Sequence, residues 1–553
     1  MSERSERIIE HGERSERTAR FDRGTVAAVV GLLLLFALPL WGLLRAEGGP
    51  MEEGFMLVFP ERVLRGDVPN VDFLHLYGPG SLWVLAGAFE LFGTSLVVER
   101  LVALVQQVGV VLAVFFVARP WGRTVAFLGA AICAVVTISP IGLVALAWVG
   151  ALTLGLWSVH VALLALRSGR SGLFVVAGVL GGLALLYRPD LVVALGLGLG
   201  VVAIRVGGRD RLRLAAGLVA GAAPILVHLV MAGPAAAWRG MVIEPVFDLR
   251  DGRRLPIPPS ATDLDGFLQK IAEIDALDWP APLNTPQQLR AWFFVLLVTA
   301  AVLVGVGRWA AVRRPSWRST VLLAVAVFSL GLLPQALQRP DSTHLAWVSA
   351  IPLGLLPVAL AEVLEGRVRR PGVRGLVAGG AVIAMLLLLF PFFTARRYVD
   401  YSLQTFGRSR SAHAIRHDGR TFYYGRADVA DELNELLHDV DARTEPGDRL
   451  FVGPSDLRFT PYVDSFVYFL LPDLTPATRY IEMDPGVANA ADSGLADELA
   501  TADVVILGDI WSNWVEPNSS TDAGSDEPNE VLRRDFCLDR DYGSYEVFYR
   551  CDA

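Results

Sequence analysis

Residues 25–54 read TVAAVVGLLLLFALPLWGLLRAEGGPMEEG, an apolar run that ends at two adjacent acidic residues, Glu52 and Glu53. As a helix, about 20 apolar residues span the ~30 Å of hydrocarbon in a bilayer. The run is longer than the apolar core of a signal peptide and lacks the small-residue cleavage site that would follow one. It therefore predicts a retained first membrane helix with a carboxylate pair just beyond its end.

Similar runs recur along the chain, which has 553 residues, is 53% hydrophobic and has a mean hydropathy of +0.45. These values predict a polytopic α-helical membrane protein. No basic stretch interleaved with aromatic residues indicates nucleic-acid binding. We expect about 11 spans, at 25–45, 99–118, 123–139, 145–166, 171–187, 190–206, 212–232, 289–307, 319–335, 345–364 and 375–395.

The charges between these runs alternate in kind. Arginine clusters occupy every second connection, and such loops stay cytoplasmic. This places the charged, low-complexity tail 1–23 in the cytoplasm, where we expect it to be disordered. Loops 46–98 and 233–288 then lie outside. Residues 79–96 are predicted to form a helix along the outer interface, because a further span there would reverse the side of every later arginine loop.

After the membrane module, 24–396, the chain changes character. Residues 397–553 are predicted to form a soluble, extracytoplasmic α/β domain, with short apolar strands at 449–453, 503–508 and 544–550 and helical patterns at 427–440 and 493–501. Cys537 and Cys551 flank a predicted turn at 541–544. In an oxidising compartment these two cysteines are expected to form a disulfide.

Two outer groups of polar residues are candidates for chemistry. Adjacent carboxylates such as Glu52 and Glu53 raise each other's pKa, so one of them suits a general base or a metal ligand, although a solvated acidic loop has the same pattern. Arg188 and Asp190 lie at a tight helical hairpin, YRPD. A guanidinium suits a phosphodiester, but an arginine at a helix end also reaches lipid headgroups without any other function.

A third group lies at 338–344, QRPDSTH. Arg339, Asp341 and His344 could together bind a phosphate or sugar hydroxyls. The alternative is that Asp341 caps the helix that begins near residue 343. The clustering of three polar residue types at the bilayer edge favours a functional site.

A family resemblance comes from several short matches in order over about fifty residues: EEGFML (52–57), LRGDVP (64–69), VDF (71–73), GPG (78–80), LFGTS (91–95) and ERL (99–101), followed later by GLALLYRPD (182–190). This pattern resembles the first outer loop of GT-C membrane glycosyltransferases, in the group of bacterial protein mannosyltransferases and aminoarabinose transferases (glycosyltransferase family 39-like). A glutamate, Glu52, stands where the family usually has an aspartate.

The resemblance implies roles for the candidates. Glu52 is the expected catalytic base, and Glu53 would assist it. If a divalent metal ion takes part, these two carboxylates are the expected ligands. Arg188 and Arg339 would neutralise the phosphate of the carrier lipid. The remaining substrate-binding candidates are Asp190, Asp341, His344, Asp72 and Tyr77.

The function implied is an inverting transfer of a hexosyl or pentosyl group from a polyprenyl-phosphate carrier to a cell-envelope glycan, lipid or protein, at the outer face of the plasma membrane. A polytopic transporter or a flippase for lipid-linked sugars is the alternative; it predicts inverted repeats, and the sequence has no evident repeat. A scaffold whose C-terminal part binds cell-wall components is a third reading.

Overall fold

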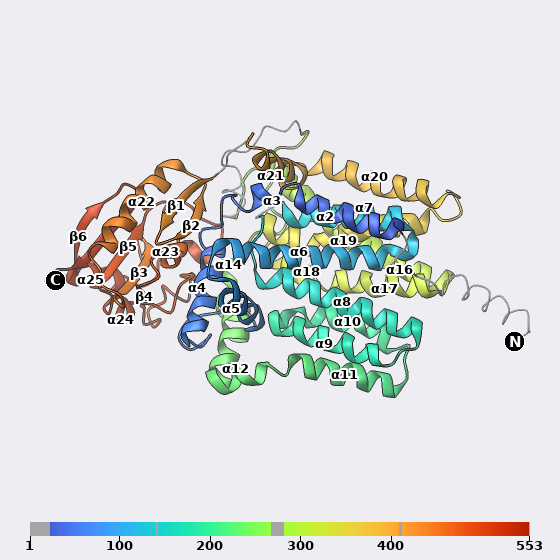
Figure 1. The fold of residues 1–553 in the computed structure, drawn as a ribbon, viewed down its shortest axis with the longest axis horizontal. Helices are drawn as coiled ribbons and strands as arrows, with labels where there is room; N and C mark the ends of the chain where they lie inside the picture. Colours follow the sequence, from blue (N-terminus) through green and yellow to red (C-terminus); the bar gives the residue numbers. More distant parts are fainter. Residues whose placement is uncertain (1–22, 140–141, 267–280, 409–411, 552–553) are drawn as a thin grey trace, which may run out of the picture.

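A bundle of helices carries a sheet-containing part at one end (Figure 1). The computed structural model describes residues 23–139, 142–266, 281–408 and 412–551. Nearly all of the predicted tail 1–23 lies outside these ranges. We call residues 23–405 the helical part, residues 412–551 the sheet part, and the end of the bundle beside the latter the sheet end.

Six helices within the described ranges are long and apolar enough to cross a membrane. Each of these six helices overlaps one of the spans predicted from the sequence. These are Leu96–Trp121 (α6, Leu96–Ala118, with η1, Arg119–Trp121), α8 (Ala147–Ser168), α16 (Thr285–Arg313), Trp317–Gln338 (α17, Trp317–Leu330, with α18, Leu333–Gln338), α19 (Ser342–Val363) and α20 (Pro371–Leu389).

The other five predicted spans are helical, but each is short or bent, so the count of eleven is not reproduced. The first one breaks at Pro39, because a proline inside a helix lacks the N–H that the helix needs. The segment 212–232 bends by 41° between its two helices. These helices are α2 (Arg23–Ala37) with α3 (Leu40–Leu43), α7 (Arg123–Ile138), α9 (Gly172–Tyr187), η2 (Pro189–Leu191) with α10 (Val192–Ala203), and α11 (Gly208–Ala222) with α12 (Ile225–Ala232).

The two long connections predicted as loops contain short helices at the sheet end. The predicted interfacial helix is α5, shorter than expected. The first connection holds α4 (Glu52–Arg65) and α5 (Gly80–Phe92), and the second holds α13 (Pro234–Trp238), the π-helix η3 (Arg239–Asp248) and α14 (Arg250–Arg253). After α20, the π-helix η4 (Phe392–Arg396) and α21 (Arg397–Thr405) lead to the sheet part.

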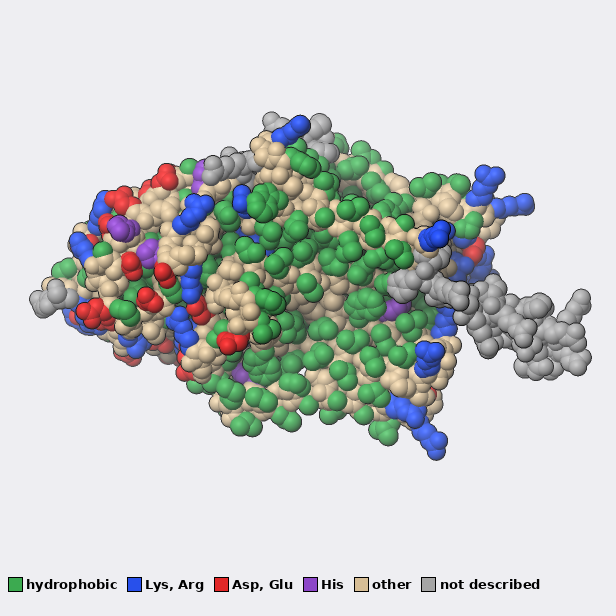
Figure 2. Space-filling view, viewed as in Figure 1, with side chains coloured by type: hydrophobic (Ala, Val, Ile, Leu, Met, Phe, Trp, Pro, Cys, Tyr) green, Lys and Arg blue, Asp and Glu red, His purple; other side chains and the backbone are tan. Residues whose placement is uncertain are grey.

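The surface of the helical part suits a membrane. Figure 2 shows hydrophobic side chains over the middle of the bundle, arginine side chains at the end away from the sheet part, and both acidic and arginine side chains on the sheet part. Many large apolar residues are exposed along the helices, including Val105, Val230 and Leu388. Exposed apolar surface of this extent fits contact with lipid rather than with water.

The sheet part contains a five-stranded sheet of order β4-β3-β5-β7-β6. The central strands β3 and β5 are parallel, and β7 is antiparallel to both of its neighbours. Every residue of β5 is buried, as expected for a strand covered on both faces. The strands are β3 (Arg449–Pro454), β4 (Thr475–Pro476), β5 (Val504–Gly508), β6 (Phe536–Asp541) and β7 (Tyr545–Arg550).

The remaining elements cover this sheet and connect it to the bundle. The helices are α22 (Ala427–Asp441), α23 (Phe466–Leu470), α24 (Leu495–Leu499), η5 (Ser519–Thr521) and α25 (Glu527–Asp535). A separate hairpin pairs β1 (His413–His417) with β2 (Arg420–Tyr424). The strands and helices predicted from the sequence correspond to β3, β5, β7, α22 and α24.

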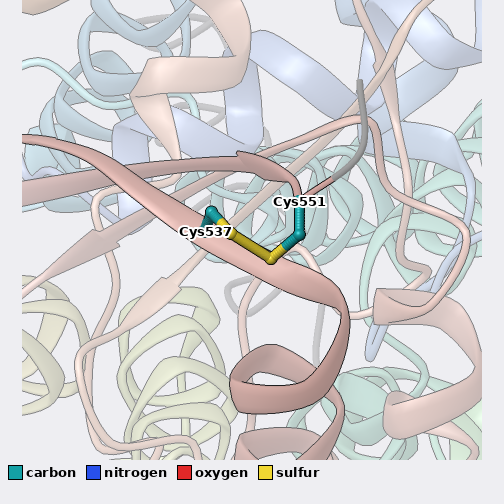
Figure 3. The surroundings of a disulfide bond; sticks show 2 residues. All are labelled: Cys537 and Cys551. Atoms are coloured by element: carbon teal, nitrogen blue, oxygen red, sulfur yellow. A yellow bond between two sulfur atoms is a disulfide. The ribbon is translucent and has the colours of Figure 1, made fainter.

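Cys537 and Cys551 form a disulfide with a Cα–Cα distance of 4.8 Å (Figure 3). Cys537 lies near the start of β6, and Cys551 directly follows β7. The hairpin places the two residues beside each other, so the bridge closes the open end of the β6–β7 pair.

Candidate active site at the junction of the helical and sheet parts

A cavity of about 710 Å³ lies between the sheet end of the helices and the sheet part. Figure 1 shows α4 and α14 at this junction. Six residues expected to form the site line the cavity together: Glu52, Tyr77, Arg188, Asp190, Arg339 and His344. They come from four segments that are far apart in the sequence, which the fold brings to one place.

Glu52 is the first residue of α4 and lines the cavity. Its Oε2 accepts a hydrogen bond of 2.5 Å from the hydroxyl of Tyr462 in the sheet part. Burial raises the pKa of Glu52, while the Tyr462 hydrogen bond and the charges of Arg339 and Arg253 oppose that rise. A partly buried carboxyl with a raised pKa suits a general base.

Close packing fixes the position of Glu52. A Cβ on Gly54 would lie 2.5 Å from the backbone nitrogen of Phe466 in α23, which is too short for any real contact. Only glycine at position 54 lets the first turn of α4 approach the sheet part this closely. The motif EEG therefore contains both the Glu52 carboxylate and Gly54, whose close contact with α23 fixes the position of that carboxylate.

Glu53 points away from the cavity and is fully buried. Arg100 of α6 donates to both of its carboxylate oxygens, at 2.7 and 2.8 Å, and to the carbonyl of Leu43 at 2.9 Å. Adjacent residues of a helix lie about 100° apart around its axis, and here Glu52 faces the cavity while Glu53 faces α6. Glu53 thus ties α4 to α6 behind the site.

The arrangement of Glu52 and Glu53 does not fit the metal site that the sequence analysis expected these two residues to form. Glu53 is engaged with Arg100, and the described residues contain no group of three or more His, Cys, Asp or Glu side chains that could hold a metal ion.

Arg188 lies between α9 and η2 at the cavity wall. Its Nε and Nη2 donate to the two carboxylate oxygens of Asp190, at 2.9 and 2.8 Å. The guanidinium lies over the rings of Tyr77 and Trp148, at 4.4 and 4.8 Å. Its Nη1 lies outside the ion pair. Stacking on two rings holds the cation in one orientation at the cavity.

The helix that carries Arg188 is held in turn by glycines. A Cβ on Gly178 or Gly182 of α9 would lie 2.3 Å from a backbone oxygen of α11. Small residues let two membrane helices approach closely, so α9 is anchored against α11 up to the last turn before Arg188.

Arg339 also lines the cavity, but carboxylates occupy most of its donors. Nη1 and Nη2 donate to Glu516 at 2.7 and 2.5 Å, Nε donates to Asp341 at 2.8 Å, and Nη1 also reaches the carbonyl of Arg253 at 2.8 Å. A guanidinium has five N–H donors. Little of Arg339 remains for a ligand, and it joins the helical part to the sheet part.

Asp341 and Asp72 do not line the cavity. Asp341 is fully buried and caps α19, accepting from the backbone N–H of His344 at 2.8 Å, with the His344 ring at 2.9 Å. Burial alone would raise its pKa, but the charges of His344 and Arg339 with these hydrogen bonds hold it at about 2. Asp72 accepts from the backbone N–H of Val68 at 2.7 Å, which stabilises a turn.

The sequence did not identify several residues of the cavity wall. From the sheet part come Tyr462, Glu482, Asp484 and Glu516; from the helical part come Arg253 and Arg254, close to Arg250. The sequence could have indicated these arginines as site residues. Three arginines within five residues, in a loop expected outside, depart from the charge rule that places arginine in the cytoplasm. The sheet-part residues are scattered singly and had no such signal.

No protein-family model and no curated protein matches the sequence. Similar solved structures include ArnT from Cupriavidus metallidurans bound to undecaprenyl phosphate, at 14% identity, 95% coverage of this chain and 97% of that chain, with a TM-score of 0.49.

The oligosaccharyltransferase of Archaeoglobus fulgidus is similar in its apo form, at 13% identity, 90% and 72% coverage and a TM-score of 0.45. It is also similar in its complex with Zn and sulfate, at 12% identity, 87% and 67% coverage and a TM-score of 0.44.

Proposed function

We propose that this protein is a membrane glycosyltransferase that moves a hexosyl or pentosyl group from a polyprenyl-phosphate carrier to an acceptor hydroxyl or amine. The observation that carries the proposal is the shared cavity of Glu52 and Arg188. A carboxyl with a raised pKa and a fixed guanidinium face one space at the ends of apolar helices. A base and an anion-binding cation are the two groups that this transfer requires.

In the proposed reaction, Glu52 takes the proton of the acceptor as its oxygen or nitrogen attacks the anomeric carbon. The bond from that carbon to the phosphate oxygen breaks, and the carrier phosphate leaves with the electron pair. A single displacement inverts the configuration at the anomeric carbon. Because the phosphate leaves with additional negative charge, a cation fixed beside it stabilises the transition state more than the ground state.

The phosphate contact is assigned to Arg188 first. Its Nη1 lies outside the Asp190 pair, whereas Arg339 is largely occupied by Glu516 and Asp341. Arg250 and Arg254 also line the cavity, and neither forms an ion pair with another described residue. These two exposed cations could attract the carrier headgroup at the mouth of the cavity.

The isoprenyl chain of the carrier would extend from the cavity into the membrane along the apolar side of the cavity. Exposed or partly exposed apolar residues from α10, η3 and α18 line that side: Val192, Val193, Met241, Val246 and Leu337. A carrier lipid could thus place its phosphate in the cavity while its chain remains among membrane lipids.

The proposed sidedness follows from the arginines. Within the helical part, arginine side chains gather at the end away from the sheet part (Figure 2). Since arginine-rich loops remain cytoplasmic, the cavity and the sheet part are assigned to the outer face of the plasma membrane.

The function is tested by lipid analysis of a strain that lacks the gene. Mass spectrometry should reveal accumulation of a polyprenyl-phosphate sugar, which the wild-type gene clears on reintroduction. Unchanged lipid-linked sugars in the deletion strain would contradict the proposal.

The donor site is tested with undecaprenyl phosphate as the probe and the full chain in lipid nanodiscs. Arg188→Ala should weaken binding by about tenfold or more, because a hydrogen bond to a charged group contributes ~1.5–3 kcal/mol. Arg188→Lys should lose less, since it keeps the charge without the fork. Arg209→Ala, at the other end of the bundle, is the control. Equal affinity of all four proteins would contradict the assignment.

A further inference from the structure

The two walls of the cavity differ in charge. Every arginine that lines it belongs to the helical part. The described residues of the sheet part contribute no arginine or lysine to the lining. They contribute instead three carboxylates and two hydroxyls: Glu482, Asp484, Glu516, Tyr462 and Ser520. Glu52 lies where the walls meet, bonded to Tyr462.

Three described side chains of the sheet-part wall carry buried polar atoms without a hydrogen-bond partner: Glu482 at Oε1, Ser520 at Oγ, and Asp484, whose Oδ1 instead forms an ion pair with Arg253. Glu482 is 4% exposed and Ser520 is 3% exposed. The Nη2 of Arg253 reaches only the other carboxylate oxygen of Glu482, at 3.3 Å. A buried polar atom without a partner costs free energy, so at a cavity wall such atoms are available to a ligand or a water that enters the cavity.

The backbone holds these carboxylates toward the cavity. Met483, between Glu482 and Asp484, is fully buried and has a φ of 50°, in the left-handed region that non-glycine residues rarely adopt. Both flanking carboxylates line the cavity, and Asp484 forms an ion pair with Arg253. Conformations of this kind occur preferentially at functional sites.

We infer that Glu482 is the acceptor-recognition residue of the site, and that it selects a hydroxyl-rich or amino acceptor without negative charge. This inference rests on the proposed function. The carrier phosphate requires the arginine wall, so the acceptor lies against the opposite wall. There Glu482 Oε1 accepts a hydrogen bond from an acceptor hydroxyl or ammonium group, and Ser520 Oγ makes a second contact.

The charge of this wall excludes an anionic acceptor group. A phosphate or carboxylate there would face Glu482 and Asp484, two carboxylates that share one arginine, Arg253, and like charges brought together at an interface repel. Burial raises the pKa of Glu482 to about 7. The charge of Arg253 opposes this rise, and the charge of Glu52 adds to it. The carboxylates are thus close enough to influence one another, and a third negative group would add to that repulsion.

The test uses three probes that differ only at C6 of the sugar: hexyl glucoside (hydroxymethyl), hexyl 6-amino-6-deoxyglucoside (ammonium) and hexyl glucuronide (carboxylate). Binding to the full chain in nanodiscs is measured by calorimetry at about pH 8, where Glu482 is mostly charged and the amine mostly protonated. We expect the ammonium probe to bind at least about tenfold more tightly than the carboxylate probe, with the neutral probe between them.

Glu482→Gln keeps the size of the side chain and removes its charge, so the preference for the ammonium probe should fall several-fold. Glu530→Gln, which changes an exposed carboxylate of α25, should leave it intact. The order of affinities in the wild-type protein tests the inference even if Glu482→Gln is poorly folded. Tightest binding of the carboxylate probe, no binding of any probe, or an unchanged preference in folded Glu482→Gln would overturn the inference.

Undecaprenyl phosphate binding separates this inference from the proposed function. If Glu482→Gln keeps its affinity for the carrier but the three probes do not discriminate, the acceptor assignment fails and the donor site stands. If the wild-type protein does not bind undecaprenyl phosphate, the proposed function fails and takes the inference with it.

Discussion

Arg100→Leu should destabilise the protein strongly, and adding Glu53→Leu should restore much of the loss. The two side chains are 2% and 0% exposed and joined by two short hydrogen bonds. Removing one partner of a buried ion pair leaves an uncompensated charge and costs about 3–5 kcal/mol. The double variant removes both charges. Its remaining defects are the carbonyl of Leu43, which Arg100 no longer satisfies, at about 1–3 kcal/mol, and the buried carboxyl of Glu99, which loses its interactions with both side chains.

The assay is equilibrium unfolding of both single variants and the double variant in detergent, followed by tryptophan fluorescence. Each single variant should lose about 3–5 kcal/mol of unfolding free energy, and the double variant clearly less. Arg213→Leu breaks the exposed pair with Asp210 and is the control, with an expected loss below about 1 kcal/mol. A double variant as unstable as the sum of the single variants would refute the reasoning.

Three further predictions concern the base, the disulfide and the topology. Tyr462→Phe removes a hydrogen bond that lowers the pKa of Glu52; because the base acts in its charged form, the acidic limb of the kcat/KM profile should move to higher pH, and an unmoved limb would separate Tyr462 from the base. Cys537→Ser with Cys551→Ser opens a loop of sequence separation 14, so thermal unfolding should report a loss of ~3 kcal/mol in the chain-entropy model; unchanged stability would argue against that contribution. A reporter active only outside the cytoplasm should work when fused at Tyr398 and fail at Arg209 and Arg370; equal activity at all three would overturn the proposed sidedness.

The sequence was sufficient for features that depend on local pattern. Apolar runs located the helices, and β5 followed from the apolar residues VVIL within 503–508, which the structure buries. The exact ends of the helices depended on breakers such as Pro39, and the number of spans cannot be derived from apolar length alone. The order of the charged loops grouped Glu52, Arg188 and His344 at one end of the bundle, and all three line the cavity.

Features that depend on tertiary contact could not be read in this way. Glu52 and Glu53 look equivalent as neighbours in the sequence, but helical geometry turns one to the cavity and the other to Arg100. Tyr462 lies 410 residues from its partner Glu52. Glu482 is one carboxylate in an acidic part of the chain, and its burial at the cavity depends on how the sheet part docks on the helices.

The central claim is that Glu52 is the base of a glycosyl transfer. The most direct measurement compares turnover and undecaprenyl phosphate affinity of the wild-type protein and Glu52→Gln, with the polyprenyl-phosphate sugar that accumulates in the deletion strain as donor. The variant keeps the size and hydrogen-bonding reach of the side chain but cannot accept the proton. Turnover should fall by roughly 10²–10⁴-fold with carrier affinity unchanged. Full transfer activity of Glu52→Gln on the native substrate would contradict the mechanism.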